Sequence, residues 1–157
     1  MNDFEELQQI AYESGVKLIE DYPFQSDQLK GLYADNTIAL NEALCSSMDK
    51  TCILAEELGH HFTSVGNIIH LKDVRCQKQE RKARMWAYDR QIGLRGLIRA
   101  YEANCADCHD MADFLEVTPT FLEEALEAYR ERYGVFTELD SYLLIFIPAL
   151  YIVKRLE

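Results

Sequence analysis

Apolar residues recur at helical spacing near the start of the chain, in a stripe made by Phe4, Leu7, Ile10 and Ala11. This spacing is typical of a helix with one face on a core. Gly15 follows directly and suits a helix C-terminus. The pattern therefore predicts a helix over residues 4–14.

A different pattern follows in the segment "GLYADNTIALN", where two short apolar runs flank Asp35 and Asn36. Aspartate and asparagine favour tight turns between paired strands. We therefore expect a β-hairpin with strands at Leu32–Ala34 and Thr37–Leu40.

The next apolar pattern is again helical and contains "LAEELGHHF", residues 54–62. Ser46 or Ser47 can cap this helix, which we expect to run to about Ser64. At 100° per residue, its apolar stripe comprises Leu54, Leu58, Phe62 and Val65. Glu56 and His60 fall on the opposite side, where a cleft can form.

The second half of the sequence also reads as helical. We expect a charged helix over residues 76–92, a short one over 97–103, and a helix-turn-helix outline over 110–133. In that outline Thr118 is a cap, Pro119 the first helical residue and Gly134 the end. The apolar run Tyr142–Val153, interrupted by Pro148, predicts two short buried strands and is too short for a membrane helix.

Together these elements predict an α+β fold that is predominantly helical, with a small antiparallel sheet beside the helix of residues 46–64. The chain has 157 residues, of which 48% are hydrophobic, enough for one compact domain. We expect a single domain, 1–157. Its parts would be a core over 1–93, a helical appendage over 94–134 and C-terminal strands over 135–157.

Charge and cysteine content narrow the function classes. The formal net charge of -11 disfavours direct binding to nucleic acid or to an anionic membrane, because phosphates would be repelled. The five cysteines are an odd number, and the N-terminus lacks a basic region followed by an apolar run. We therefore expect a cytoplasmic protein with free thiols.

The segment "LAEELGHHF" is close to the zinc-protease motif H-E-x-x-H, with Glu56 in place of the first histidine. Residues four apart on a helix share a face, so Glu56 and His60 can bind one metal ion. Glu57 would then act as general base. A second register pairs Glu57 with His61 but leaves Leu58 in the base position.

A catalytic zinc requires a third protein ligand. Glu80 is our candidate, because the small residues Ala83 and Ala87 let its helix approach closely, and His70 is the competitor. Carboxylate-rich ligands also suit Mn²⁺ or Fe²⁺. The alternative is a solvated helix face, with Glu80 and Arg84 as an ordinary ion pair four residues apart.

Four segments in order resemble the ImmA/IrrE family of phage and mobile-element metallopeptidases: "GLYADNTIALN", "TCILAEELGHHFTS", "KQERKARMWAYDRQI" and "ADFLEVTPTFLEEALEAYRERYG". The resemblance covers residues 15–134. It implies a zincin-like site with His60 and Glu80 as ligands, Glu57 as base, and Glu56 where the family usually has histidine. It thus corresponds to an E-E-x-G-H variant.

The family resemblance implies a zinc-dependent endopeptidase that cleaves a helix-turn-helix repressor of a prophage or mobile element. The alternative is a catalytically weak or inactive relative that binds a protein without cutting it. Whether the C-terminal apolar run completes a sheet or packs against a second copy in a homodimer is left open.

Two further patterns carry weaker functional hypotheses. "CADCH", which places Cys105 and Cys108 before His109, matches a c-type haem attachment motif, but free thiols are the simpler interpretation. The helix-turn-helix outline carries acidic residues where DNA would require basic ones. A core helix pair or a protein-docking surface is the interpretation that we prefer.

Overall fold

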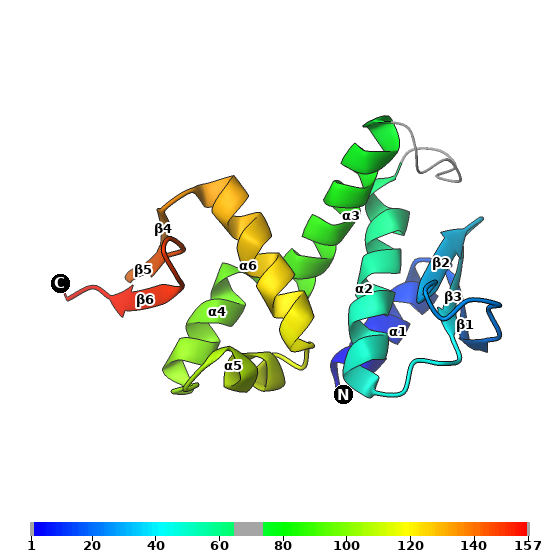
Figure 1. Cartoon of the computed structure of the whole chain (residues 1–157), viewed down its shortest axis with the longest axis horizontal. Helices are drawn as coiled ribbons and strands as arrows, with labels where there is room; N and C mark the ends of the chain where they lie inside the picture. The colour runs from blue at the N-terminus through cyan, green and yellow to red at the C-terminus, as the bar shows by residue number, and fades with distance from the viewer. Residues whose placement is uncertain (1, 65–73, 157) are drawn as a thin grey trace. The chain divides into compact units, whose positions relative to one another are not determined.

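The computed structural model describes residues 2–64 and 74–156 as an α+β structure (Figure 1). The chain divides into two compact units, residues 1–90 and 91–157. The expectation of a single domain, with parts that end at residues 93 and 134, stays a prediction. Within the described residues, no helix has the length and apolar character needed to cross a bilayer.

The described residues of the first unit form a three-stranded sheet and three helices, the last of which runs one residue past the end of the unit. Their bounds are α1 Asp3–Glu13, β1 Lys17–Tyr22, β2 Gly31–Ala34, β3 Thr37–Asn41, α2 Ser47–Thr63 and α3 Val74–Gln91. The helix and hairpin predictions are confirmed to within a few residues. The hairpin turn has positive φ at Asp35 and Asn36, which these two residue types tolerate best after glycine.

The sheet has the order β1-β3-β2, and β1 pairs with β3 in parallel. The predicted antiparallel pairing holds for β2 and β3, but the prediction of a wholly antiparallel sheet was wrong because it did not include β1. The segment Lys17–Tyr22 does not alternate between apolar and polar residues, and its partner strand lies beyond the hairpin turn. The central strand β3 is buried, while α1 contacts β1 and α2 contacts both hairpin strands.

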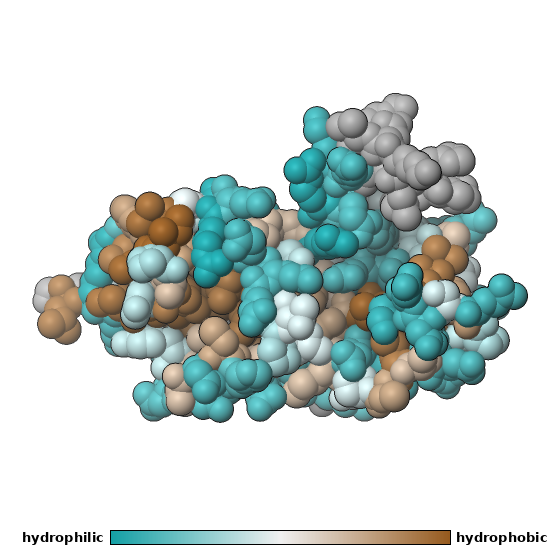
Figure 2. Space-filling model, viewed as in Figure 1, coloured by the Kyte–Doolittle hydropathy of each residue, from teal (hydrophilic) through white to brown (hydrophobic). Residues whose placement is uncertain are grey.

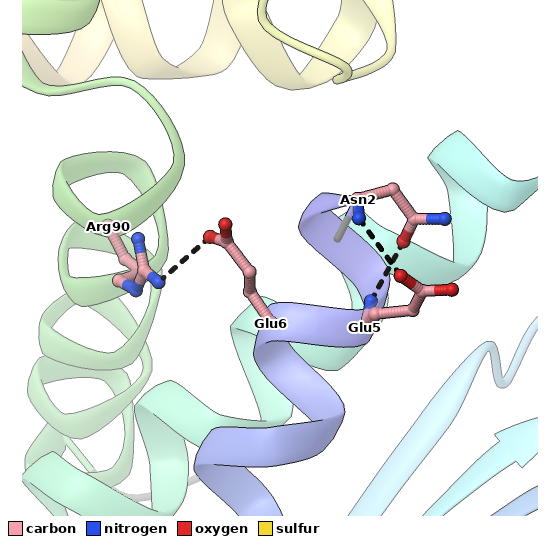
Figure 3. Close-up of polar contacts among 4 residues, drawn as sticks. All are labelled: Asn2, Glu5, Glu6 and Arg90. Carbon is pink, nitrogen blue, oxygen red and sulfur yellow. Dashed lines mark hydrogen bonds and ion pairs between the residues drawn. The ribbon is translucent and has the colours of Figure 1, made fainter.

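Side chains fix the ends of α1. Asn2 accepts a hydrogen bond from the Glu5 amide (2.9 Å) and its own amide donates to the Glu5 carboxylate (3.1 Å), which forms a capping box. Glu6 forms an ion pair with Arg90 of α3, at 3.5 Å (Figure 3). The capping box fixes the start of α1, and the ion pair joins α1 to α3.

The second unit contains three helices and a second sheet. Their bounds are α4 Gly93–Glu102, α5 Cys108–Phe114, α6 Pro119–Tyr133, β4 Phe136–Leu139, β5 Tyr142–Ile145 and β6 Tyr151–Lys154. Thr118 caps α6 as predicted, accepting a hydrogen bond from the Phe121 amide at 3.1 Å. The core of the second unit is built around Tyr129 and Phe146.

The second sheet is antiparallel with the order β4-β5-β6. The prediction of two strands interrupted near Pro148 is confirmed, but the prediction that both are buried is wrong for β6. Tyr151 and Val153 of this strand are exposed, and only alternate residues of β5 are buried.

Candidate active site

Helix α2 carries the predicted site residues and is fixed at both its start and its buried face. The Ser46 hydroxyl accepts a hydrogen bond from the Asp49 amide (3.0 Å), which satisfies a free backbone donor of the first turn. Leu54 and Leu58 are fully buried, as the periodicity predicts. Phe62 was wrongly predicted to join them, because it is exposed and stacks on Trp86 with ring centroids 5.1 Å apart.

Helices α2 and α3 approach each other at Gly59. A Cβ atom placed on this glycine would lie 2.2 Å from the carbonyl oxygen of Ala83, which is far inside van der Waals contact. Ala83 and Ala87 are both fully buried, in keeping with the small residues predicted for this helix. The sequence analysis missed the role of Gly59, although a glycine inside a helix costs stability and so signals a packing reason.

The close approach brings His60 of α2 and Glu80 of α3 together. His60 Nε2 lies 3.0 Å from Glu80 Oε2, and Arg84 Nε lies 3.4 Å from the other oxygen of that carboxylate. The hydrogen bond from His60 lowers the pKa of Glu80, against the effect of burial. These side chains lie 20 positions apart in the sequence, and they are two of the three predicted ligands.

His60 is held in a partly desolvated environment. Burial alone would lower its pKa, but the hydrogen bond with Glu80 and the negative charges of Glu57, Glu80 and Glu56 outweigh it, so the pKa of His60 is raised. Its second ring nitrogen, Nδ1, is buried and has no hydrogen-bond partner. A buried imidazole nitrogen without a partner is costly, so an additional group at this site would be favoured.

Glu57 is the most strongly perturbed group of the site. Burial raises the pKa of its carboxyl group to about 7; His60 lowers it, while Glu56 and Glu80 add to the rise. The start of β2 lies against this carboxyl group: a Cβ atom on Gly31 would be 3.2 Å from Glu57 Oε1. A carboxyl group with a pKa near neutrality can both accept and release a proton.

His61, the accessory candidate, contacts the hairpin. Tyr33 Oη lies 2.8 Å from His61 Nδ1, and the two rings meet edge to face. Tyr33 is two residues beyond Gly31, and His61 is one helical turn beyond Glu57, so β2 and this part of α2 run alongside each other. The sequence analysis missed Tyr33, since no local pattern reveals a partner 28 positions away.

The donor set fits a divalent metal only in part. A histidine nitrogen and a carboxylate oxygen in contact are suitable zinc ligands. Glu56 is close enough for its charge to raise the pKa of both Glu57 and His60. Among the described side chains, those of residues 2–64 and 77–156, however, no three His, Cys, Asp or Glu residues are grouped to hold a metal ion. His70 lies outside the described residues.

Strand β2 forms an edge of the sheet in the described part of the chain. The Asn41 amide donates to the Lys30 carbonyl (2.9 Å), so these two residues form a hydrogen-bonded pair. Because hydrogen-bonded pairs alternate with non-hydrogen-bonded pairs in an antiparallel ladder, Leu32 and Ala34 make the next bonds to β3. The backbone N–H and C=O groups of Gly31 and Tyr33 therefore point to the open side of β2. An extended peptide could pair with them.

Comparisons with protein-family models, with curated proteins and with solved structures found no match to this chain.

Proposed function

We propose that this protein is a zinc-dependent endopeptidase of the kind that the ImmA/IrrE resemblance implies. The observation that carries the proposal is the position of Glu57, whose carboxyl group has a pKa of about 7 close to the contact between His60 and Glu80. Metal-dependent peptide hydrolysis needs these parts: a ligand set, and a group that moves a proton near neutral pH. Surface ion pairs on a solvated helix face would not require a desolvated carboxyl group.

In this proposal Glu56, His60 and Glu80 hold the metal, with Mn²⁺ or Fe²⁺ as alternatives to zinc. Bound zinc would supply Lewis-acid chemistry toward a peptide carbonyl and its attacking water. Glu57 accepts a proton from that water and later donates it to the leaving amine. In the metal-free protein a pKa of about 7 leaves both forms of this carboxyl group populated at neutral pH.

The proposed substrate is a helix-turn-helix repressor of a prophage or mobile element. An extended segment of it would pair with the open side of β2, through the backbone groups of Gly31 and Tyr33. Because Gly31 has no side chain, β2 itself lies close to Glu57, and a segment paired with β2 would be near this carboxyl group. The same protein would then be cytoplasmic and would act on repressor protein, not on DNA.

A second candidate function is protein binding without cleavage. It is favoured by one observation: no three suitable side chains are grouped for a metal within the described residues. Glu56 is the reason for doubt about catalysis, because carboxylate oxygen replaces the imidazole nitrogen that the motif usually provides at this position. Such a relative would still use the edge of β2 but would leave the repressor intact.

Cleavage of a helix-turn-helix repressor, chosen from the genes that flank the gene of this protein, would separate the two functions. Purified protein and repressor are incubated with zinc, and the products are followed by mass spectrometry. Glu57→Gln should bind the repressor and fail to cut it, whereas the exposed control Glu42→Gln should cut it normally. Binding without cleavage by the unaltered protein would favour the second function, and cleavage by Glu57→Gln would remove this residue from the mechanism.

A further inference from the structure

The β4-β5-β6 sheet has apolar residues on both of its faces. On one face, the alternate β5 residues Tyr142 and Leu144 are buried in the unit. The pairing register assembles the other face from two rows, Phe136-Ile145-Tyr151 and Glu138-Leu143-Val153. Antiparallel sheets that present one face to water usually carry polar residues there, so this second face has the composition of a buried one.

This second face is nevertheless open. Phe136 is 54% exposed, Tyr151 57% and Val153 47%. Its only charged residue, Glu138, forms an ion pair with Arg155. Figure 2 shows hydrophobic atoms gathered over this part of the second unit. These exposed apolar side chains are contiguous and not scattered singly over the surface, which makes the face a candidate interaction site.

The size of the face limits what can cover it. Strands of four residues in a three-stranded sheet span about 14 Å by 10 Å, or less than about 200 Å², whereas a stable dimer needs about 800 Å² from each partner. A stable dimer cannot be built on this face alone, and a helix that covers it makes a small, transient interface. A single helix, about 10 Å in diameter, matches the width of the sheet.

The net charge of the second unit indicates which charge a partner should carry. Residues 91–157 contain 12 Asp and Glu against 6 Lys and Arg, a difference of -6. An approaching segment that carries basic residues beside its apolar ones is attracted, whereas a second copy of this acidic chain is repelled.

We propose that the face formed by Phe136, Leu143, Ile145, Tyr151 and Val153 binds an amphipathic helix of a basic protein. The apolar side chains of that helix lie on the sheet. None of these residues belongs to the candidate active site, so the docking surface does not depend on metal binding or on cleavage.

A synthetic helix tests the proposal with the full chain. The probe is a fluorescein-labelled peptide of about 14 residues with leucine on one face and lysine elsewhere, long enough to form helix when bound. Two matched peptides accompany it: one with glutamate for lysine, and one with the same composition but scrambled leucine positions. Fluorescence anisotropy should detect binding of the first peptide alone.

Variants locate the binding surface without changing the charge. A double variant, Phe136→Ser with Tyr151→Ser, should weaken binding about tenfold or more, since two aromatic anchors are lost. Tyr12→Ser removes an aromatic residue that is 81% exposed on α1 and should change nothing. The single change Val153→Thr repeats the test with the fold preserved if the double variant is unstable.

Three results would overturn the proposal. The first is the absence of binding by the leucine-lysine peptide. The second is equal binding by the scrambled peptide or by the face variants, which would mean attraction by charge alone. The third is a dimer in sedimentation velocity that the face variants dissociate, because a second copy would then occupy this surface.

Discussion

Replacing Glu57 with glutamine should stabilise the metal-free protein at alkaline pH. A rise of the carboxyl pKa from 4.5 to about 7 means that the folded state resists ionisation of this group. The unfolded chain ionises near its ordinary pKa, so the folded protein loses stability as the pH rises from about 4.5 to 7. At 1.36 kcal/mol per pKa unit, the loss above pH 7 is about 3 kcal/mol.

Glutamine has nearly the same shape and carries no charge, so Glu57→Gln should avoid this loss. Urea unfolding in the presence of a chelator measures this difference. The free energy of unfolding of the variant should exceed that of the unaltered protein by about 3 kcal/mol at pH 8. At pH 4, where the carboxyl group is protonated in both states, the two proteins should differ little. The gain should therefore grow with pH.

Glu42→Gln provides the matched control, since Glu42 is exposed. Its stability difference from the unaltered protein should stay close to zero at both pH values. The reasoning would be refuted if Glu57→Gln were equally or less stable at pH 8, or if its advantage were the same at pH 4. Either result would mean that the carboxyl group of Glu57 is well solvated, and the proposed base would lose its physical support.

Two further substitutions test the packing around this group. Gly59→Ala should lower the free energy of unfolding by about 1–3 kcal/mol, because the added methyl group meets the carbonyl of Ala83. Gly96→Ala should cost less in the same urea titration, because its methyl group would meet only side-chain atoms, the nearest a carbon of Leu115 at 3.3 Å. Tyr33→Phe removes the hydroxyl group that contacts His61 at 2.8 Å and should cost about 1 kcal/mol. A Tyr33→Phe protein as stable as the unaltered one would show that this contact does not hold β2 against α2.

Local chemistry accounts for the parts of the fold that the sequence predicts well. The hairpin follows from Asp35 and Asn36, whose side chains tolerate positive φ, and α2 begins at the serine cap that the pattern indicates. Strand β1 was missed because its partner is not local and its residues do not alternate. The exposure of β6 was missed because an apolar run indicates a strand but not whether another surface covers it.

The candidate site likewise has features that the sequence predicts and features that it does not. Helical spacing places Glu56, Glu57 and His60 together. The small residues Ala83 and Ala87 pointed to Glu80, as did the family resemblance, and the structure brings Glu80 within 3.0 Å of His60. The constraint on Gly59 depends on how closely α3 crosses α2, which no single-helix pattern contains. The raised pKa of Glu57 likewise depends on burial by separate elements, so it could not be predicted from the motif.

Equilibrium zinc binding tests the central claim most directly. The unaltered protein should bind about one equivalent of zinc in competition with a chromogenic chelator, and His60→Ala and Glu80→Gln should each weaken binding strongly. Glu42→Gln should bind as the unaltered protein does. Less than about a tenth of an equivalent in the unaltered protein, or unchanged affinity in His60→Ala, would contradict a metal site at the contact between α2 and α3.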